Sequence, residues 1–186
     1  MNLPPQPSVS RAWALAQLVL AQIFLHSSMA GMRLAAPLLA LRDGHSAFTV
    51  GVLLALFSLS QVFLAIPAGR FADRHGLRKP MRLGVSAAML GAGLAVAVPS
   101  LSMLCVSALL MGGATGVAIV ALQRHVGRAA QDPTELKQVF SWLAIGPAIS
   151  NFLGPVTAGL LIDHAGVWVG GAAGDTNGFR AAFLVM

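Results

Sequence analysis

Two long uncharged stretches constrain the fold of this chain more than any other feature. Residues 47–68 carry no charged side chain over 22 positions, and residues 83–123 carry none over 41. A water-soluble helix pair would need polar outer faces, which these stretches lack. The mean hydropathy of +0.77 and the charged fraction of 10% agree with this, since soluble domains carry about a quarter charged residues. We therefore predict an all-α polytopic membrane protein.

The apolar runs predict five membrane spans and the beginning of a sixth. Val98-Pro99-Ser100 divides the 41-residue run, because proline and serine permit a tight hairpin there. The first run is about twice as long as the core of a cleaved signal peptide, so we expect an uncleaved span after a Pro-rich, non-helical tail of residues 1–11. Residues 12–186 then form one bundle, with spans at about 12–41, 48–67, 83–98, 101–122, 138–162 and 179–186. Because the last segment stops within an element, we expect the chain to be the front part of a longer protein.

Positive charge is distributed unevenly between the two sides of these spans. Nine of the twelve Lys and Arg residues fall on one side, namely Arg11, the five between positions 70 and 82, Arg124, Arg128 and Lys137. Arg33, Arg42 and Arg180 fall on the other. The positive-inside rule then predicts a cytoplasmic N-terminus, in a protein of the bacterial inner membrane. The basic residues are confined to loops without interleaved aromatic residues, which argues against a nucleic-acid partner.

The basic stretch GRFADRHGLRKPMR, residues 69–82, predicts a short loop between the second and third spans. It holds six of the chain's seventeen Lys, Arg and His residues between two apolar runs. The order and spacing of its residue types resemble the loop between helices two and three of the major facilitator superfamily of secondary transporters. The residues that carry this resemblance are Gly69, Asp73, Arg74, Gly76, Arg78 and Lys79.

The resemblance implies a gating role for this loop. The acid equivalent to Asp73 helps to lock the cytoplasmic side of such transporters by contacting a helix of the C-terminal half. The neighbouring arginines complete a charge network that breaks and reforms during transport. Gly69 and Gly76 would allow close approach and a tight turn. An ordinary positive-inside loop explains the charge, but not an acid and two glycines at these positions.

The fifth span contains two Gly-Pro steps. Gly146-Pro147 and Gly154-Pro155, with Gly159 beyond them, predict a helix that can bend and approach a neighbour closely. The second step resembles the antiporter motif of exporters in the same superfamily. Ala158 and Ser150 stand where that motif commonly has glycine. A packing helix with no bearing on transport direction stays an equal alternative.

The fourth span is glycine-rich and uncharged. Gly112, Gly113 and Gly116 predict close helix packing rather than phosphate binding, because a nucleotide loop would also need a strand and a lysine. Drug/proton antiporters of the superfamily carry an arginine here, where this chain has Ala108 or Leu109. That specific assignment is weakened accordingly. The single Cys105 excludes a disulfide framework.

Three polar residues share one face of the first span. At 100° per residue, Gln22, His26 and Arg33 fall at about 0°, 40° and 20°. Polar groups at membrane depth normally face the bundle or a wet cavity. We expect this face to line a substrate path, with Arg33 meeting an anion and His26 carrying a proton. In the alternative, Arg33 extends to the membrane surface.

These features together predict a transporter of a small solute that works by alternating access, driven by an ion gradient or by the solute's own gradient. Its expected partners are the solute, the lipid bilayer and a C-terminal half that completes the transporter. No metal site, cofactor site or nucleotide-hydrolysing motif is present in the sequence. A membrane protein that keeps this fold without transporting, or an inactive fragment, stays the alternative. An intramembrane enzyme is disfavoured, since no pair of catalytic residue types faces each other in the spans.

Overall fold

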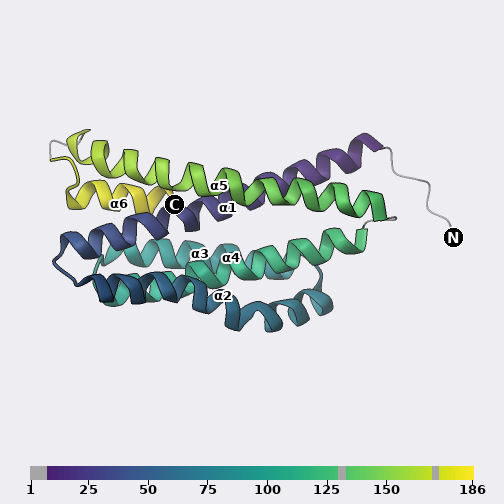
Figure 1. Cartoon of the computed structure of the whole chain (residues 1–186), viewed down its shortest axis with the longest axis horizontal. Helices are drawn as coiled ribbons and strands as arrows, with labels where there is room; N and C mark the ends of the chain where they lie inside the picture. Colours follow the sequence, from purple (N-terminus) through teal and green to yellow (C-terminus); the bar gives the residue numbers. More distant parts are fainter. Residues whose placement is uncertain (1–7, 130–132, 169–171) are drawn as a thin grey trace.

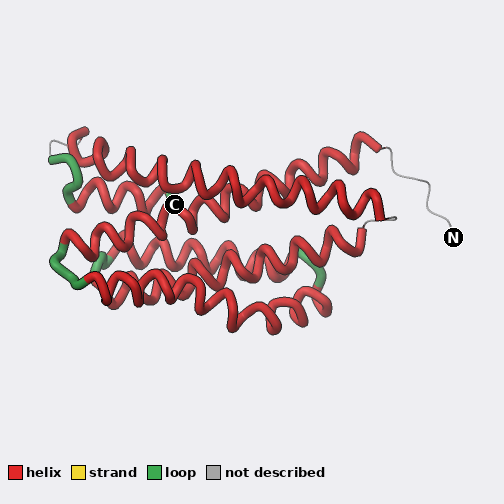
Figure 2. The backbone as a smooth tube through the Cα atoms, in the orientation of Figure 1, coloured by secondary structure: helices red, strands yellow, loops and turns green. Residues whose placement is uncertain are grey.

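The computed structural model describes residues 8–129, 133–168 and 172–186, which form helices joined by short connections (Figures 1 and 2). No strand occurs in these described ranges. The all-α class predicted from the sequence is therefore confirmed. The helices are α1 (Ser8–Arg42), α2 (Ala47–His75), α3 (Arg78–Ala97), α4 (Leu101–Ala129), α5 (Pro133–Trp168) and α6 (Thr176–Val185).

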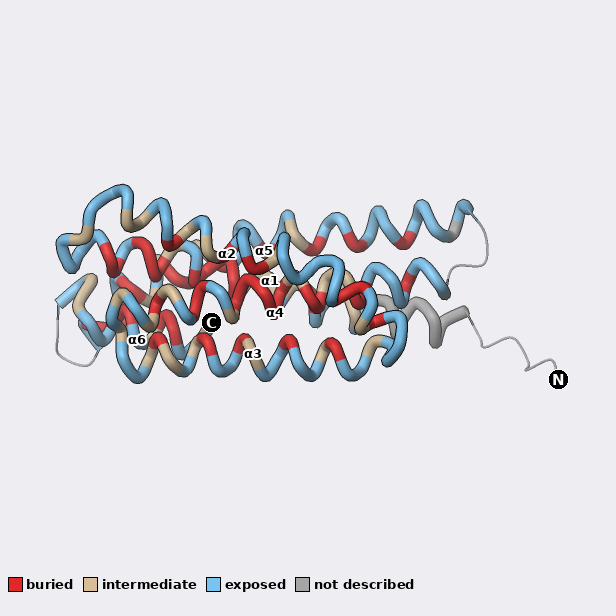
Figure 3. The backbone as a smooth tube through the Cα atoms, turned by 90° about the horizontal axis from the view of Figure 1, so that it is seen from below, coloured by how far each residue is buried: buried red, intermediate tan, exposed pale blue. Residues whose placement is uncertain are grey.

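Five of these helices are long and apolar enough to cross a membrane. Their candidate spans are 16–42, 47–75, 78–97, 101–128 and 136–168, with mean hydropathies between 1.3 and 2.2. Buried residues make up 61% of the most apolar part of α4 but only 17% of that of α2, so α4 is the central helix of the bundle. Figure 3 shows the buried positions gathered along α1 and α4.

The helices extend further than the sequence predicted, and the predicted loops are correspondingly shorter. The prediction of a loop over residues 69–82 is wrong, because α2 continues to His75 and α3 begins at Arg78, which leaves Gly76 and Leu77 between them. Arginine and lysine are good helix formers, so the helix continues past the end of its apolar run. Basic side chains in the last turn of α2 also suit the carbonyl end of a helix.

The same correction applies to the other ends. α1 begins at Ser8, inside the tail predicted to be non-helical, and α4 and α5 take up most of the charged stretch 123–137. α5 begins at Pro133, and proline is a favoured first helical residue. α5 also runs to Trp168, beyond the predicted end of the fifth span at about residue 162.

The six helices form two groups of three. α1, α5 and α6 contact one another on one side, while α4 packs against α2 and α3 on the other (Figure 1). α1–α4, α1–α2, α3–α6 and α4–α5 contacts join the two groups. The α2–α3 turn lies at the same end of the bundle as the start of α1, the end of α4 and the start of α5.

Glycines on α4 bring α2 unusually close. A Cβ added at Gly112 would lie 2.1 Å from the carbonyl oxygen of Phe57, and one added at Gly116 would lie 3.2 Å from the Cα of Gln61. At Gly113, the Leu64 side chain would lie 2.8 Å away. Small residues let membrane helices approach backbone to backbone, so the prediction of close packing for this glycine run is confirmed.

Candidate functional site

Asp73 is the centre of a charge network at the basic end of the bundle. It lies near the end of α2, and its two carboxylate oxygens accept hydrogen bonds from two arginines of α4. Arg124 donates from Nη1 to Oδ2, and Arg128 donates from Nη2 to Oδ1. The two arginines are four residues apart and therefore share one face of α4. The network thus joins the ends of α2 and α4.

Gly69 makes room for one of these arginines. A Cβ at this position would lie 2.7 Å from Nη2 of Arg124 and 3.0 Å from its Cζ. The guanidinium therefore lies directly over the backbone of α2, one turn before the acid that it binds. Any side chain here would displace the guanidinium, which accounts for glycine at this spacing from Asp73.

Gly76 closes α2. Its φ of +69° lies in the left-handed region that glycine occupies without strain, and its N–H donates to the Ala72 carbonyl. The predicted close approach and tight turn are both present. The remaining basic residues predicted for the gate, Arg74, Arg78 and Lys79, are exposed and form no ion pair with any described residue.

An open cavity of about 640 Å³ lies beside this network, between α2, α4 and α5. Its walls combine apolar side chains with two arginines, one of which is the Arg124 that binds Asp73. The lining residues are Ala65, Ile66, Arg70, Val120, Gln123, Arg124 and Phe140. Neither this cavity nor a role for Arg70, Arg124 or Arg128 was predicted from the sequence. A signal for the α4 pair was available in the i, i+4 spacing of two arginines just past an uncharged run.

A stripe of small residues on α5 packs against α1. A Cβ at Gly154 would lie 2.4 Å from the Ser27 carbonyl oxygen and 2.8 Å from the Gly31 nitrogen. One turn earlier, the Ser150 hydroxyl donates to the Ile23 carbonyl at 3.0 Å. One turn earlier again, Gly146 faces Gln22, at 3.5 Å from its Cδ to the position of a Cβ. The predicted close approach of this helix to a neighbour is therefore present.

The other members of the Gly-Pro motif do not take part in this contact. Pro147 and Pro155 lie inside α5 next to the small-residue stripe and are half-buried. Gly159 has open space where a Cβ would be. Only part of the predicted motif thus has a packing role in the described residues.

The polar face of α1 divides between the interior and the surface. Gln22 is 8% exposed, and His26 is half-buried. Both line a small cavity of about 10 Å³ between α1, α3 and α4, to which Met81 and Thr115 also contribute. Gln22 Oε1 and His26 Nδ1 are buried there and have no hydrogen-bond partner within the described part of the chain. A cavity of this size holds about one water molecule.

Arg33 is placed differently. It is exposed, within the span of α1, and has no ion pair or hydrogen bond with any described residue. The structure therefore brings Gln22 and His26 to one cavity but does not include Arg33 in it.

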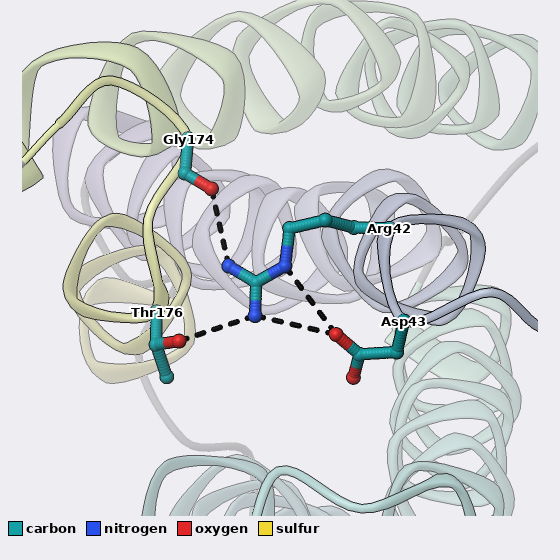
Figure 4. Close-up of polar contacts among 4 residues, drawn as sticks. All are labelled: Arg42, Asp43, Gly174 and Thr176. Carbon is teal, nitrogen blue, oxygen red and sulfur yellow. Dashed lines mark hydrogen bonds and ion pairs between the residues drawn. The ribbon is translucent and has the colours of Figure 1, made fainter.

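The opposite end of the bundle has its own arginine contact. Arg42, the last residue of α1, donates from Nη1 to the Gly174 carbonyl and from Nη2 to Thr176 Oγ1, both at 3.1 Å (Figure 4). It also pairs with Asp43 at 3.3 Å and lies 5.0 Å from the ring centroid of Phe179. The α5–α6 connection is thereby tied to the end of α1.

Among the described residues, no three His, Cys, Asp or Glu side chains gather as metal ligands would. The arrangement instead offers arginines, two acids paired with them at opposite ends of the bundle, and closely packed helices. Such a set can bind anions and form charge pairs that break and reform.

Comparison with known proteins gives two matches. The family model described as Major Facilitator Superfamily matches residues 18–186. Multidrug resistance protein D of Escherichia coli (strain K12) is 32% identical over 120 residues. The match covers 64% of this chain and 29% of that relative, so the chain is similar to less than a third of the relative's length.

Proposed function

The chain belongs to the Major Facilitator Superfamily, and we propose that it forms the N-terminal bundle of a secondary transporter that moves a small solute by alternating access. Five apolar helices make it an integral membrane protein. The observation that carries the proposal is the network of Asp73 with Arg124 and Arg128, because it joins two helix ends through contacts that can exchange.

The energy of this network suits a gate. The side chains of Asp73, Arg124 and Arg128 are 36%, 47% and 59% exposed, so solvent screens both pairs. Exposed ion pairs of this kind contribute about 0–1 kcal/mol each. A change of about 1.4 kcal/mol alters a conformational equilibrium tenfold, so such pairs can bias two states without locking either. In the complete transporter, Asp73 would exchange its α4 partners for a helix of the C-terminal half.

We place the Asp73 end of the bundle in the cytoplasm, with the N-terminus on the same side. The basic residues at the α2–α3 turn, the end of α4 and the start of α5 lie at one end of the molecule (Figure 1), which supports this orientation. The bacterial inner membrane is the proposed location, as expected for a relative of an Escherichia coli protein.

Export is the proposed direction of transport. The name of the E. coli relative supports it, and so does the Gly154-Pro155 step that resembles the antiporter motif. The polar face of α1 is the proposed substrate path. His26 and Gln22 would offer unpaired polar atoms, and Arg33 would meet an anionic group of the solute or an acid of the C-terminal half.

The test measures solute transport into vesicles that contain the full-length protein. A panel of drugs and metabolites is supplied to these vesicles with and without an ion gradient. We expect at least one solute to move against its gradient. We also expect Asp73→Asn to lower the transport rate about two- to tenfold while membrane insertion and abundance stay normal.

Correctly inserted protein that moves no solute would favour the alternative, a membrane protein that keeps the fold without transporting. Unchanged rates in the Asp73→Asn protein would remove the gating role but leave the transporter assignment standing.

A further inference from the structure

We propose that the open cavity between α2, α4 and α5 binds an amphipathic anion, whose phosphate head contacts Arg70 and Arg124 and whose apolar part lies against the cavity wall. This inference goes beyond the proposed transport function, because it assigns a ligand to a site away from the polar face of α1. It also gives that ligand an effect on the Asp73 network.

The composition of the cavity defines the ligand. Its volume of about 640 Å³ lies in the range of small-molecule sites. Ile66, Val120 and Phe140 provide apolar wall from three different helices, while the two arginines add positive charge. An apolar solute would leave the arginines unused, and inorganic phosphate would leave the apolar wall unused. A molecule with both parts uses the whole surface.

Arg70 is available for this role. It lines the cavity, is exposed and has no hydrogen bond or ion pair with any described residue. A free guanidinium presents a planar fork of N–H donors, which matches the oxygens of a phosphate. The acid nearest to it in sequence is Asp73, whose two oxygens are already occupied by arginines of α4.

Arg124 links the cavity to the gate. The same guanidinium lines the cavity and donates to Asp73. A phosphate bound in the cavity therefore competes with the Asp73 carboxylate for this guanidinium. Because coupling between two sites is reciprocal, an anion that weakens the pair must itself bind more tightly when the pair is removed.

Phosphate heads of this kind have two sources, anionic membrane lipids and soluble phosphate esters. Basic residues at the cytoplasmic membrane surface attract anionic headgroups, and the proposed orientation puts Arg70 at that surface. The experiment therefore includes one arm for each source.

The soluble arm titrates dodecyl phosphate into the purified full-length protein in dodecyl maltoside micelles and measures the heat of binding, with empty micelles as the blank. We expect saturable binding that weakens about tenfold or more in Arg70→Gln. The matched control is Arg82→Gln, which removes the same charge from exposed α3 surface outside the cavity and should leave the affinity within about twofold. Asp73→Asn should tighten binding about three- to tenfold, because it frees Arg124.

The lipid arm places the full-length protein in phosphatidylcholine nanodiscs with and without phosphatidylglycerol, and counts retained phosphatidylglycerol molecules by native mass spectrometry. If Arg70→Gln abolishes the retention of phosphatidylglycerol and Arg82→Gln preserves it, the phosphate head belongs to a lipid. Saturable dodecyl phosphate binding without such retention identifies a soluble ester.

Four results would overturn the proposal or one of its parts. Binding of dodecyl phosphate that does not saturate would show that the cavity is not a specific site. Equal losses of affinity in Arg70→Gln and Arg82→Gln would show that binding is general charge attraction. Inorganic phosphate that binds as tightly as dodecyl phosphate would exclude a role for the apolar wall. Unchanged affinity in Asp73→Asn would refute the competition for Arg124. Because these assays measure binding alone, they can succeed or fail independently of transport.

Discussion

Arg42 donates a hydrogen bond to the carbonyl of Gly174 across 132 positions of sequence, and so ties the end of α1 to the α5–α6 connection. The carbonyl it uses belongs to a residue with a φ of +70°, which turns the chain into α6. Asp175 then caps α6 by accepting from the Gly178 N–H at 2.8 Å. The Arg42 guanidinium thus holds the turn that precedes α6, and the position of α6 depends on that turn.

Replacing Arg42 tests this arrangement. Arg42→Gln should lower the free energy of unfolding by about 1–2 kcal/mol, through lost hydrogen bonds and the lost contact with Phe179. The free energy of unfolding of Arg42→Lys should lie between those of the wild type and Arg42→Gln, because lysine keeps the charge without the planar fork. Thermal unfolding of the purified protein in detergent measures both. Arg180→Gln is the control, since Arg180 is exposed and unpaired among the described residues, and a loss there of equal size would contradict the assignment.

Gly69→Ala should act like a weaker form of Asp73→Asn. The new methyl group would lie 2.7 Å from Arg124 Nη2, so the flexible arginine must move while the backbone stays in place. We expect a fall of about two- to fivefold in the transport rate, smaller than for Asp73→Asn, because one exposed ion pair is disturbed and not two.

The control for that change is Gly93→Ala, because a Cβ at Gly93 meets nothing within 4 Å. Both substitutions raise helix propensity by about 1 kcal/mol, so any difference between them comes from Arg124. Equal transport rates in the two variants would refute the explanation given for Gly69.

Gly154 and Gly159 offer a second matched pair, eight and thirteen residues beyond Gly146 on α5. Gly154→Ala would press against the Ser27 carbonyl, which belongs to backbone and cannot move aside, so we expect a loss of about 1–3 kcal/mol in stability. Gly159→Ala meets open space and should keep or raise the unfolding temperature. A rise in both variants would show that α1 and α5 are packed less closely than described.

The orientation can be measured by labelling. In a background without Cys105, single cysteines at Arg78, Arg128, Pro99 and Gly174 are exposed to an impermeant maleimide outside intact cells. We expect reaction at positions 99 and 174 only, because nine of twelve basic residues lie on the other side. Reaction at position 78 without reaction at 174 would reverse the topology.

Arg33 separates the two alternatives for the polar face of α1. If it contacts an anion, Arg33→Gln should lower vesicle transport at least tenfold, with Arg33→Lys intermediate because it loses the planar fork. His26→Asn, measured at several pH values alongside, tests a proton-carrying role. Normal transport in Arg33→Gln at normal abundance would place Arg33 at the membrane surface.

The sequence was sufficient for the helical class, the number of long spans and the closeness of particular helix contacts. Uncharged runs report directly on burial in lipid, and glycine at helical spacing predicts approach, as Gly112 and Gly154 confirm. The helices were predicted too short at their ends, because hydropathy marks the edge of the membrane and not the last backbone hydrogen bond of the helix. α2 therefore continues through Asp73 to His75.

The partners of Asp73 could not be read from the sequence. Which of the twelve Lys and Arg residues reaches this acid depends on the relative rotation of α2 and α4, and the glycine contacts between these helices set that rotation. The cavity lined by Arg70 and Phe140 has the same origin, since its walls come from three helices far apart in the chain. Local patterns describe the faces of one helix, whereas these features depend on how several helices meet.

The grouping of the helices into α1, α5, α6 and α2, α3, α4 determines how the bundle can deform. Arg42 and Ser150 make their polar contacts inside the first group, and Asp73 makes its contacts inside the second. No hydrogen bond or ion pair between described residues of different helices crosses from one group to the other. The seam between the groups is apolar packing around the small cavity of Gln22 and His26. A small shear movement between the two groups would therefore break no hydrogen bond or ion pair between described residues, and would need only repacking of apolar side chains.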